Sequence, residues 1–175
     1  MIQQWPLIFS SYLPNLLTFN LITALGEEPG WRGFALPRLQ QQYGALLGSL
    51  ILSTLHSAWH LPGFFIPALG LGALTIPGFV TFALSGIPAT IFYTWIYNNT
   101  SGSLLMMILL HSASGAAQSF LSQLIPVVPN AADVLIWIKI VLGACALLII
   151  IFTRGRLSYT PNRVSQPADA PLTTA

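Results

Sequence analysis

The pattern of hydrophobic and polar positions divides the chain into long apolar stretches separated by clusters of Pro, Gly and charged residues. Each stretch is close to the roughly 20 apolar residues that a helix needs to cross a bilayer. They lack the alternation of a barrel strand, and a helix satisfies its backbone hydrogen bonds internally in lipid. The pattern predicts an all-α, polytopic transmembrane helix bundle of about five spans. The spans are Pro6 to Leu25, Ala45 to Ile66, Ile76 to Tyr97, Leu104 to Ile125, and Val134 to Phe152.

Prolines and the composition of the tail indicate where these elements end. Pro14, Pro62 and Pro88 are expected to kink or end helices, because proline removes a backbone donor and clashes with the preceding turn. Residues 1–153 are predicted to form one transmembrane domain. The tail 154–175 is rich in Pro, Ser, Thr and Ala, so we expect it to be disordered outside the bilayer.

Composition and charge exclude several classes of protein. Charged residues make up only 6% of the chain, whereas a soluble domain carries about 25%. The basic residues are too scattered to form the stripe that nucleic-acid binding requires. The single cysteine, Cys145, cannot form an intrachain disulfide. These features leave an integral membrane protein with membrane lipid as its surroundings and no nucleic-acid partner.

The distribution of arginines predicts the orientation in the membrane. With five spans, the segment after the first span, the segment after the third span and the C-terminal tail share one side of the bilayer. The positive-inside rule makes this side cytoplasmic, so the C-terminus is expected in the cytoplasm and the N-terminus outside. The arginines expected there are Arg32, Arg38, Arg154, Arg156 and Arg163.

Ionisable residues at membrane depth are the strongest indication of a functional site. Insertion of Arg, Lys or Asp at the centre of a span costs about 2.5 to 3.5 kcal/mol, so such residues mark function by default. Glu27 and Glu28 end the first span, His60 lies in the second, and His111 lies in the fourth. Because these three spans can pack together, we expect the side chains to converge on one polar cavity.

The two adjacent acids are expected to divide the chemistry between them. Glu28 and Arg32 are four residues apart and share a helix face, so an ion pair can neutralise Glu28 and leave Glu27 as a free base. The alternative is a solvated helix end at which both carboxylates face lipid headgroups.

The histidines also have a structural alternative, in which each is a core residue hydrogen-bonded to a backbone carbonyl. Their combination with the acids favours the functional interpretation. His56 shares a helix face with His60 and is interpreted as a supporting donor or a headgroup contact. Gln118 lies two turns after His111, and Asn20 two turns before Glu27, so both are candidates to line the cavity.

Three blocks of the chain resemble the CPBP family, which contains the CAAX prenyl proteases and bacteriocin-processing (Abi-type) enzymes. The run Gly26-Glu27-Glu28-Pro29-Gly30-Trp31-Arg32-Gly33-Phe34 resembles its EExxxR motif. Trp59-His60-Leu61-Pro62 resembles the second motif, and Gly102-Ser103-Leu104-Leu105 leading to His111 resembles the last. The resemblance covers roughly residues 22 to 117.

This resemblance implies an intramembrane (metallo)endopeptidase that cleaves a hydrophobic or lipid-anchored peptide, expected in a bacterial plasma membrane. In the family pattern, Glu27, His60 and His111 activate water against a peptide carbonyl, and Glu28 and Arg32 support them. The same three residues are a plausible zinc set with an open position, although a Glu-His pair can activate water without a metal.

The chain departs from the family pattern at two positions. His56 stands where the second motif usually begins with an aromatic residue, and Gly115 stands where the last motif usually ends in asparagine. The resemblance gives that asparagine the role of an oxyanion donor, and loss of one such donor costs about 2.7 to 4 kcal/mol of transition-state stabilisation. Ser114 or Gln118 could substitute for it, and Gly115→Asn would restore it.

Two other functions remain open at this point. A catalytically degenerate relative could act as a membrane scaffold or bacteriocin-immunity protein, for which Gly115 is the main support. A small transporter or channel could use the same buried charges as a proton path. The sequence contains no HExxH, GxSxG, P-loop or GxGxxG motif that would favour other hydrolase or nucleotide-binding classes.

The arginine distribution generates a test of topology. A reporter fused after Ala175 should be cytoplasmic, because arginines from separate parts of the chain gather on one side of the predicted bundle. Paired phosphatase and fluorescent-protein fusions would measure this, since the first is active only outside the cytoplasm. An external C-terminus would contradict either the span count or the orientation.

Overall fold

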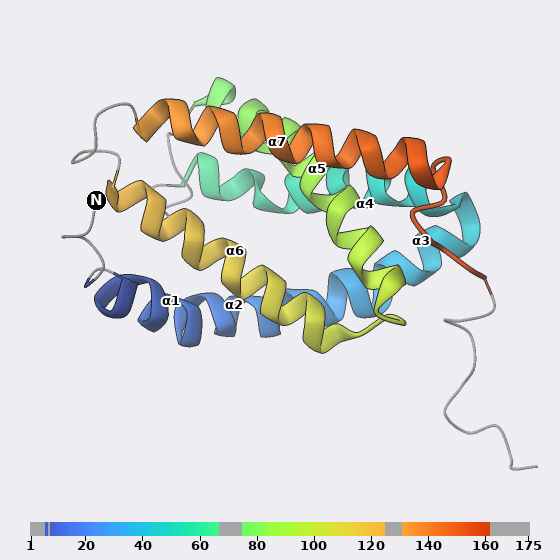
Figure 1. Cartoon of the computed structure of the whole chain (residues 1–175), viewed down its shortest axis with the longest axis horizontal. Coiled ribbons are helices and arrows are strands. Elements are labelled where there is room, and N and C mark those ends of the chain that lie inside the picture. Colours follow the sequence, from blue (N-terminus) through green and yellow to red (C-terminus); the bar gives the residue numbers. More distant parts are fainter. Residues whose placement is uncertain (1–5, 7, 67–74, 125–130, 162–175) are drawn as a thin grey trace, which may run out of the picture.

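The computed structural model is a bundle of helices (Figure 1), and it describes residues 6, 8–66, 75–124 and 131–161. This described part contains helices and no strand, which confirms the prediction of an all-α bundle. Its α-helices are α1 (Leu13–Leu17), α2 (Phe19–Glu28), α3 (Leu36–Tyr43), α4 (Ala45–His60), α5 (Ile76–Asn99), α6 (Leu104–Leu124) and α7 (Ala131–Thr153). The π-helix η2 (Ile8–Tyr12) precedes α1, the π-helix η3 (Pro29–Ala35) joins α2 to α3, and the 3-10 helix η4 (Leu61–Phe64) follows α4.

Helices α5, α6 and α7 contain segments long and apolar enough to cross a membrane: Ile76–Asn99, Leu104–Leu121 and Ile136–Thr153. The first predicted span is divided among η2, α1 and α2, with a break at Thr18, and the second consists of α4 and η4. Large apolar side chains on α7, including Trp137, Ile151 and Phe152, are exposed. An apolar exposed surface of this kind suits contact with lipid.

The three prolines act differently from one another. Pro62 lies in η4, directly after α4 ends at His60, as predicted. Pro14 lies in the first turn of α1, where a missing backbone donor costs little. Pro88 lies inside α5, which continues on both sides of it. The neighbouring helices α4 and α7, which pack against α5, support this continuation.

One end of the bundle gathers the segments that the topology prediction places together. Figure 1 shows α3, the α5–α6 turn and the end of α7 at one end, with α1 at the other. Arg38 lies on α3, and Arg154 directly follows α7. Arg32 differs from these, because it is buried and ion-paired, and Arg163 lies outside the described residues. Which end faces the cytoplasm stays a prediction.

The interface between α4 and α5 consists largely of small residues. Ala45, Ser49, Ser53 and Ser57 recur every fourth position on the buried face of α4. The Ser49 hydroxyl donates to Thr94 Oγ1 of α5 at 2.8 Å. Small residues allow close approach of helices in lipid, and hydroxyl groups hydrogen-bond across the interface. Near the end of α4, His60 also packs against α5, with its ring centroid 5.1 Å from that of Phe82.

The packed part of the chain extends past the predicted domain boundary at residue 153. Leu157 is fully buried, and its carbonyl accepts a hydrogen bond from Asn98 Nδ2 at 2.9 Å. Asn98 also exchanges reciprocal amide hydrogen bonds with Gln40 of α3, at 3.1 and 2.7 Å. These contacts join α3, α5 and the segment after α7. The remainder of the predicted tail, residues 162–175, lies outside the described residues.

Asn20 of α2 occupies the space next to Gly115 of α6. A Cβ atom at position 115 would collide with the Oδ1 atom of Asn20 and lie 3.1 Å from its Cγ atom. Asn20 is buried, and its Nδ2 atom donates to the Asn15 carbonyl at 3.1 Å. The expectation that Gly115→Asn restores a donor stays a prediction, and the carboxamide of Asn20 would have to move to admit the new side chain.

We predict that Gly115→Ala lowers the thermal stability of the detergent-solubilised protein. The added methyl group would displace Asn20 from its hydrogen bond, and overpacking of this kind costs about 1 to 3 kcal/mol. Gly143→Ala is the matched control, since a Cβ atom there has nothing within 4 Å. Asn20→Ala should restore part of the loss in the double variant. Equal melting temperatures for Gly115→Ala and Gly143→Ala would contradict the observed packing.

Candidate active site

The segment that carries the two acids is helical throughout. Helix α2 ends at Glu28, the π-helix η3 follows at Pro29 without a break, and α3 continues from Leu36. Pro29 has no backbone N–H group, and π-helical turns are frequent at functional sites. Glu28 is fully buried, and only 10% of the Glu27 side chain is exposed. A solvated helix end with both carboxylates free in the headgroup region does not describe this geometry.

One carboxylate oxygen of Glu28 contacts two side chains, those of Arg32 and His111. Arg32 Nη1 lies 2.8 Å from Glu28 Oε1, which is the predicted ion pair. His111 Nδ1 lies 2.7 Å from the same oxygen. An ionised carboxylate only accepts hydrogen bonds, so Nδ1 of His111 carries the hydrogen and donates it. Within the described residues, Glu28 Oε2 and Arg32 Nε are buried without a hydrogen-bond partner in the protein.

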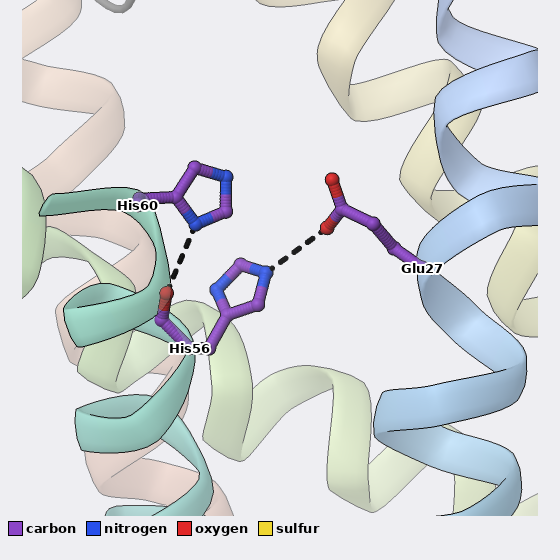
Figure 2. A group of neighbouring side chains, drawn as sticks. All are labelled: Glu27, His56 and His60. Atoms are coloured by element: carbon purple, nitrogen blue, oxygen red, sulfur yellow. Dashed lines mark hydrogen bonds and ion pairs between the residues drawn. The ribbon is translucent and has the colours of Figure 1, made fainter. Parts of the chain in front are cut away.

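Glu27 faces a pair of imidazoles on α4 (Figure 2). His56 Nε2 lies 3.2 Å from Glu27 Oε2, and His60 Nδ1 donates to the carbonyl oxygen of His56 at 2.9 Å. One ligand atom from each of these three residues lies within 4.8 Å of the other two. A Glu-His-His group that could bind a metal is thus present. It contains Glu27 and His60 as predicted, but its third member is His56, whereas His111 contacts Glu28.

Aromatic rings surround the two imidazoles. Trp31 lies edge-on to His56, with ring centroids 5.2 Å apart. Trp59 and Phe82 lie against His60, at centroid distances of 4.8 and 5.1 Å. These rings limit the orientations open to both histidines and lower the polarity around them. His56 therefore lies in the candidate site together with Glu27 and His60.

Tyr93 of α5 borders the site, and the sequence analysis does not predict it. Its ring lies 4.9 Å from the guanidinium carbon of Arg32, and its hydroxyl lies 2.5 Å from Ser114 Oγ. Ser114 Oγ also donates to the His111 carbonyl oxygen at 3.0 Å. A tyrosine inside an apolar span gives a weak signal, since many such residues simply pack. Of the other candidate polar residues, Asn20 is buried and Gln118 is exposed.

Comparison with known proteins identifies the family to which the chain belongs. Residues 9–117 match the model of a family described as type II CAAX prenyl endopeptidase Rce1-like. A protein named CAAX prenyl protease 2, from Methanococcus maripaludis, is 29% identical over 117 residues, which is 65% of this chain and 43% of that protein. The chain thus spans less than half the length of this relative. No solved structure matches the chain.

The matched region contains the acids, the arginine and the histidines of the site, from Glu27 to His111. It also covers more than half of the chain. The described fold agrees, since it is helical and includes helices of membrane-spanning length. The chain belongs to the Rce1-like family of type II CAAX prenyl endopeptidases.

Proposed function

We propose that the protein is an intramembrane endopeptidase that hydrolyses a peptide bond with water activated by Glu27 and histidine. The observation that carries this proposal is the different pairing of two adjacent carboxylates. Glu28 is bound by Arg32 and His111, whereas Glu27 faces histidines. Two neighbouring acids with different partners can take different roles, one as a fixed counter-ion and one as a base.

In this proposal, Glu27 accepts the proton of the attacking water. The Glu27 carboxylate lies at the end of α2 with little exposure, and its charge is not used by an arginine or a lysine in the ion pairs of the described residues. The Nδ1 atom of His60 donates to a backbone carbonyl, which leaves its Nε2 atom with a lone pair toward Glu27. A carboxylate and an imidazole nitrogen together can hold and polarise a water molecule.

His111 is proposed to act on the opposite side of the reacting carbonyl. Because its Nδ1–H donates to Glu28 Oε1, the Glu28 charge stabilises a protonated imidazole and fixes the ring orientation. The Nε2 atom of that ring can then donate to a developing oxyanion or to the leaving amine. Arg32 and Tyr93 hold the Glu28 end of this arrangement. Ser114, which we considered as a substitute donor, is committed to Tyr93 and the His111 carbonyl.

The proposed substrate is a hydrophobic or lipid-anchored peptide that reaches the site within the membrane. The name of the relative, CAAX prenyl protease 2, supports a substrate of this class. The site also lies among helices with apolar exposed side chains, including Leu25, Trp59 and Leu105. An apolar segment would lose little solvation in approaching such a surface.

Zinc fits the chemistry of the donor atoms near Glu27. Two imidazoles and one carboxylate with an open fourth position are a ligand set of catalytic zinc sites. Zinc bound there would activate water as a Lewis acid. Glu27 and His60 are common to the predicted set and to the group that the structure brings together. His111, the third predicted ligand, retains only Nε2 for this purpose because Nδ1 donates to Glu28.

A non-catalytic scaffold or immunity function is the alternative, and one observation favours it. The asparagine expected at position 115 is replaced by glycine, and Asn20 fills the space. The Nδ2 atom of Asn20 donates one hydrogen bond, to the Asn15 carbonyl. The alternative predicts no cleavage and no effect of Glu27 on the cellular role of the protein.

We predict that Glu27→Gln abolishes cleavage while the folded protein survives. The amide keeps the size of the side chain but cannot accept a proton, and loss of a general base costs about 100- to 10,000-fold in rate. Cleavage of a membrane-anchored reporter peptide in proteoliposomes would measure the rate, and a thermal melt would report the fold. Arg38→Gln, on the exposed face of α3, is the control. Wild-type activity in Glu27→Gln would contradict its role as base.

Glu28→Gln should instead reduce stability together with activity. It would leave Arg32 buried without a counter-ion, and breaking a buried pair costs about 3 to 5 kcal/mol. The matched measurement is the melting temperature of Glu28→Gln against Glu27→Gln in the same detergent. If both variants have the melting temperature of the wild type, the proposed division of roles is wrong. If the wild type cleaves no membrane peptide and Glu27→Gln leaves the cellular phenotype intact, the scaffold function replaces the protease.

A further inference from the structure

The position of His56 carries an inference beyond water activation by Glu27. We propose that Glu27, His56 and His60 form a binding site for one divalent transition-metal ion, with His56 as a ligand in place of His111. The family pattern has an aromatic residue at position 56, so this ligand is a property of this chain. The proposal concerns metal binding and does not depend on peptide cleavage.

The distances suit a single ion. Donor atoms bound to one zinc at about 2.0 to 2.2 Å lie at most about 4.4 Å apart. The three candidate atoms lie within 4.8 Å of one another, and His56 Nε2 already lies 3.2 Å from Glu27 Oε2. Figure 2 shows the carboxylate directed from α2 toward both rings on α4. Small side-chain rotations would therefore place all three donor atoms on one ion.

The tautomer of His60 is the one that a metal ligand requires. The His56 carbonyl oxygen can only accept a hydrogen bond, so the hydrogen of His60 resides on Nδ1. The lone pair is then on Nε2. Metal-ligating histidines commonly donate their second ring N–H to a backbone carbonyl or a carboxylate, which orients the ring and raises its basicity. His60 has this partner before any ion binds.

The spacing of the two histidines on α4 suits the binding of one metal ion. His56 and His60 are four residues apart on α4, and their rings lie 4.5 Å apart between centroids. Two histidines at this spacing share one face and can bind a single ion, as in the HExxH helix. A carboxylate from α2 completes a His₂Glu set and leaves a position open for water.

The charges around the site also favour a dication. The arginine of the motif, Arg32, is ion-paired with Glu28 and not with Glu27. Glu27 is paired with His56, and this pair carries full charge only when the imidazole is protonated. A buried carboxylate that lacks a permanent cation is costly, and a metal ion would neutralise it more effectively than a neutral imidazole N–H donor.

Cobalt titration of the full chain tests the proposal. The protein would be purified in detergent, treated with a chelator, and titrated with Co²⁺ while visible absorption is recorded. We expect one Co²⁺ per chain, with bands of four- or five-coordinate cobalt, and displacement by Zn²⁺. His56→Phe should weaken binding by at least about 100-fold, beyond the 10- to 100-fold loss typical of an outer hydrogen-bond partner.

His111→Gln is the matched control, because its amide can still donate to Glu28 and the variant removes the other candidate imidazole. It should bind Co²⁺ as the wild type does. Glu27→Gln provides a second test if His56→Phe fails to fold, since an amide is a poor ligand of similar size. The proposal is overturned if the wild type binds no Co²⁺, if His111→Gln loses binding, or if the folded His56→Phe or Glu27→Gln retains it. Binding without cleavage would refute only the protease function, and cleavage without binding only the metal site.

Discussion

The buried interaction of Glu28 with Arg32 and His111 is the constraint on which the site depends. A carboxylate with no exposure to solvent is stable only if cationic and donor groups replace its hydration. Arg32 comes from the next helical turn, but His111 comes from α6, so the carboxylate joins parts of the chain that are distant in sequence. The position of Glu27 follows from this pairing, because the adjacent side chain on a helix must point in another direction.

The motif that carries this pairing is continuously helical. Helix α2, the π-turn η3 and α3 keep the backbone hydrogen bonds of a polar segment satisfied inside the chain. A loop at this depth would expose unpaired backbone groups to an apolar environment. This helical segment also brings Trp31 against His56 and places the Arg32 guanidinium over the ring of Tyr93 of α5. The aromatic groups thus border both halves of the site, the Glu28 half and the Glu27 half.

Close packing of helices sets the remaining distances. The stripe of small residues on α4 packs against α5, and Gly115 allows α6 to approach Asn20 of α2. Without a hydrophobic driving force between helices in lipid, such contacts supply much of the association energy. They also fix how far α4 stands from α2, and hence the separation between the imidazoles and the Glu27 carboxylate.

The sequence by itself determined the all-α membrane class, the family resemblance, the Glu28–Arg32 pair and the proximity of Glu27 to His60. Apolar length, charge scarcity and helical spacing are local properties, and each can be read along the chain. Only the tertiary structure decided that His111 binds Glu28, that His56 joins Glu27, that Asn20 fills the space beside Gly115, and that Tyr93 borders the site. These pairings depend on the rotation and separation of α2, α4, α5 and α6. Contacts among many side chains fix those quantities, and no periodicity in the sequence encodes them.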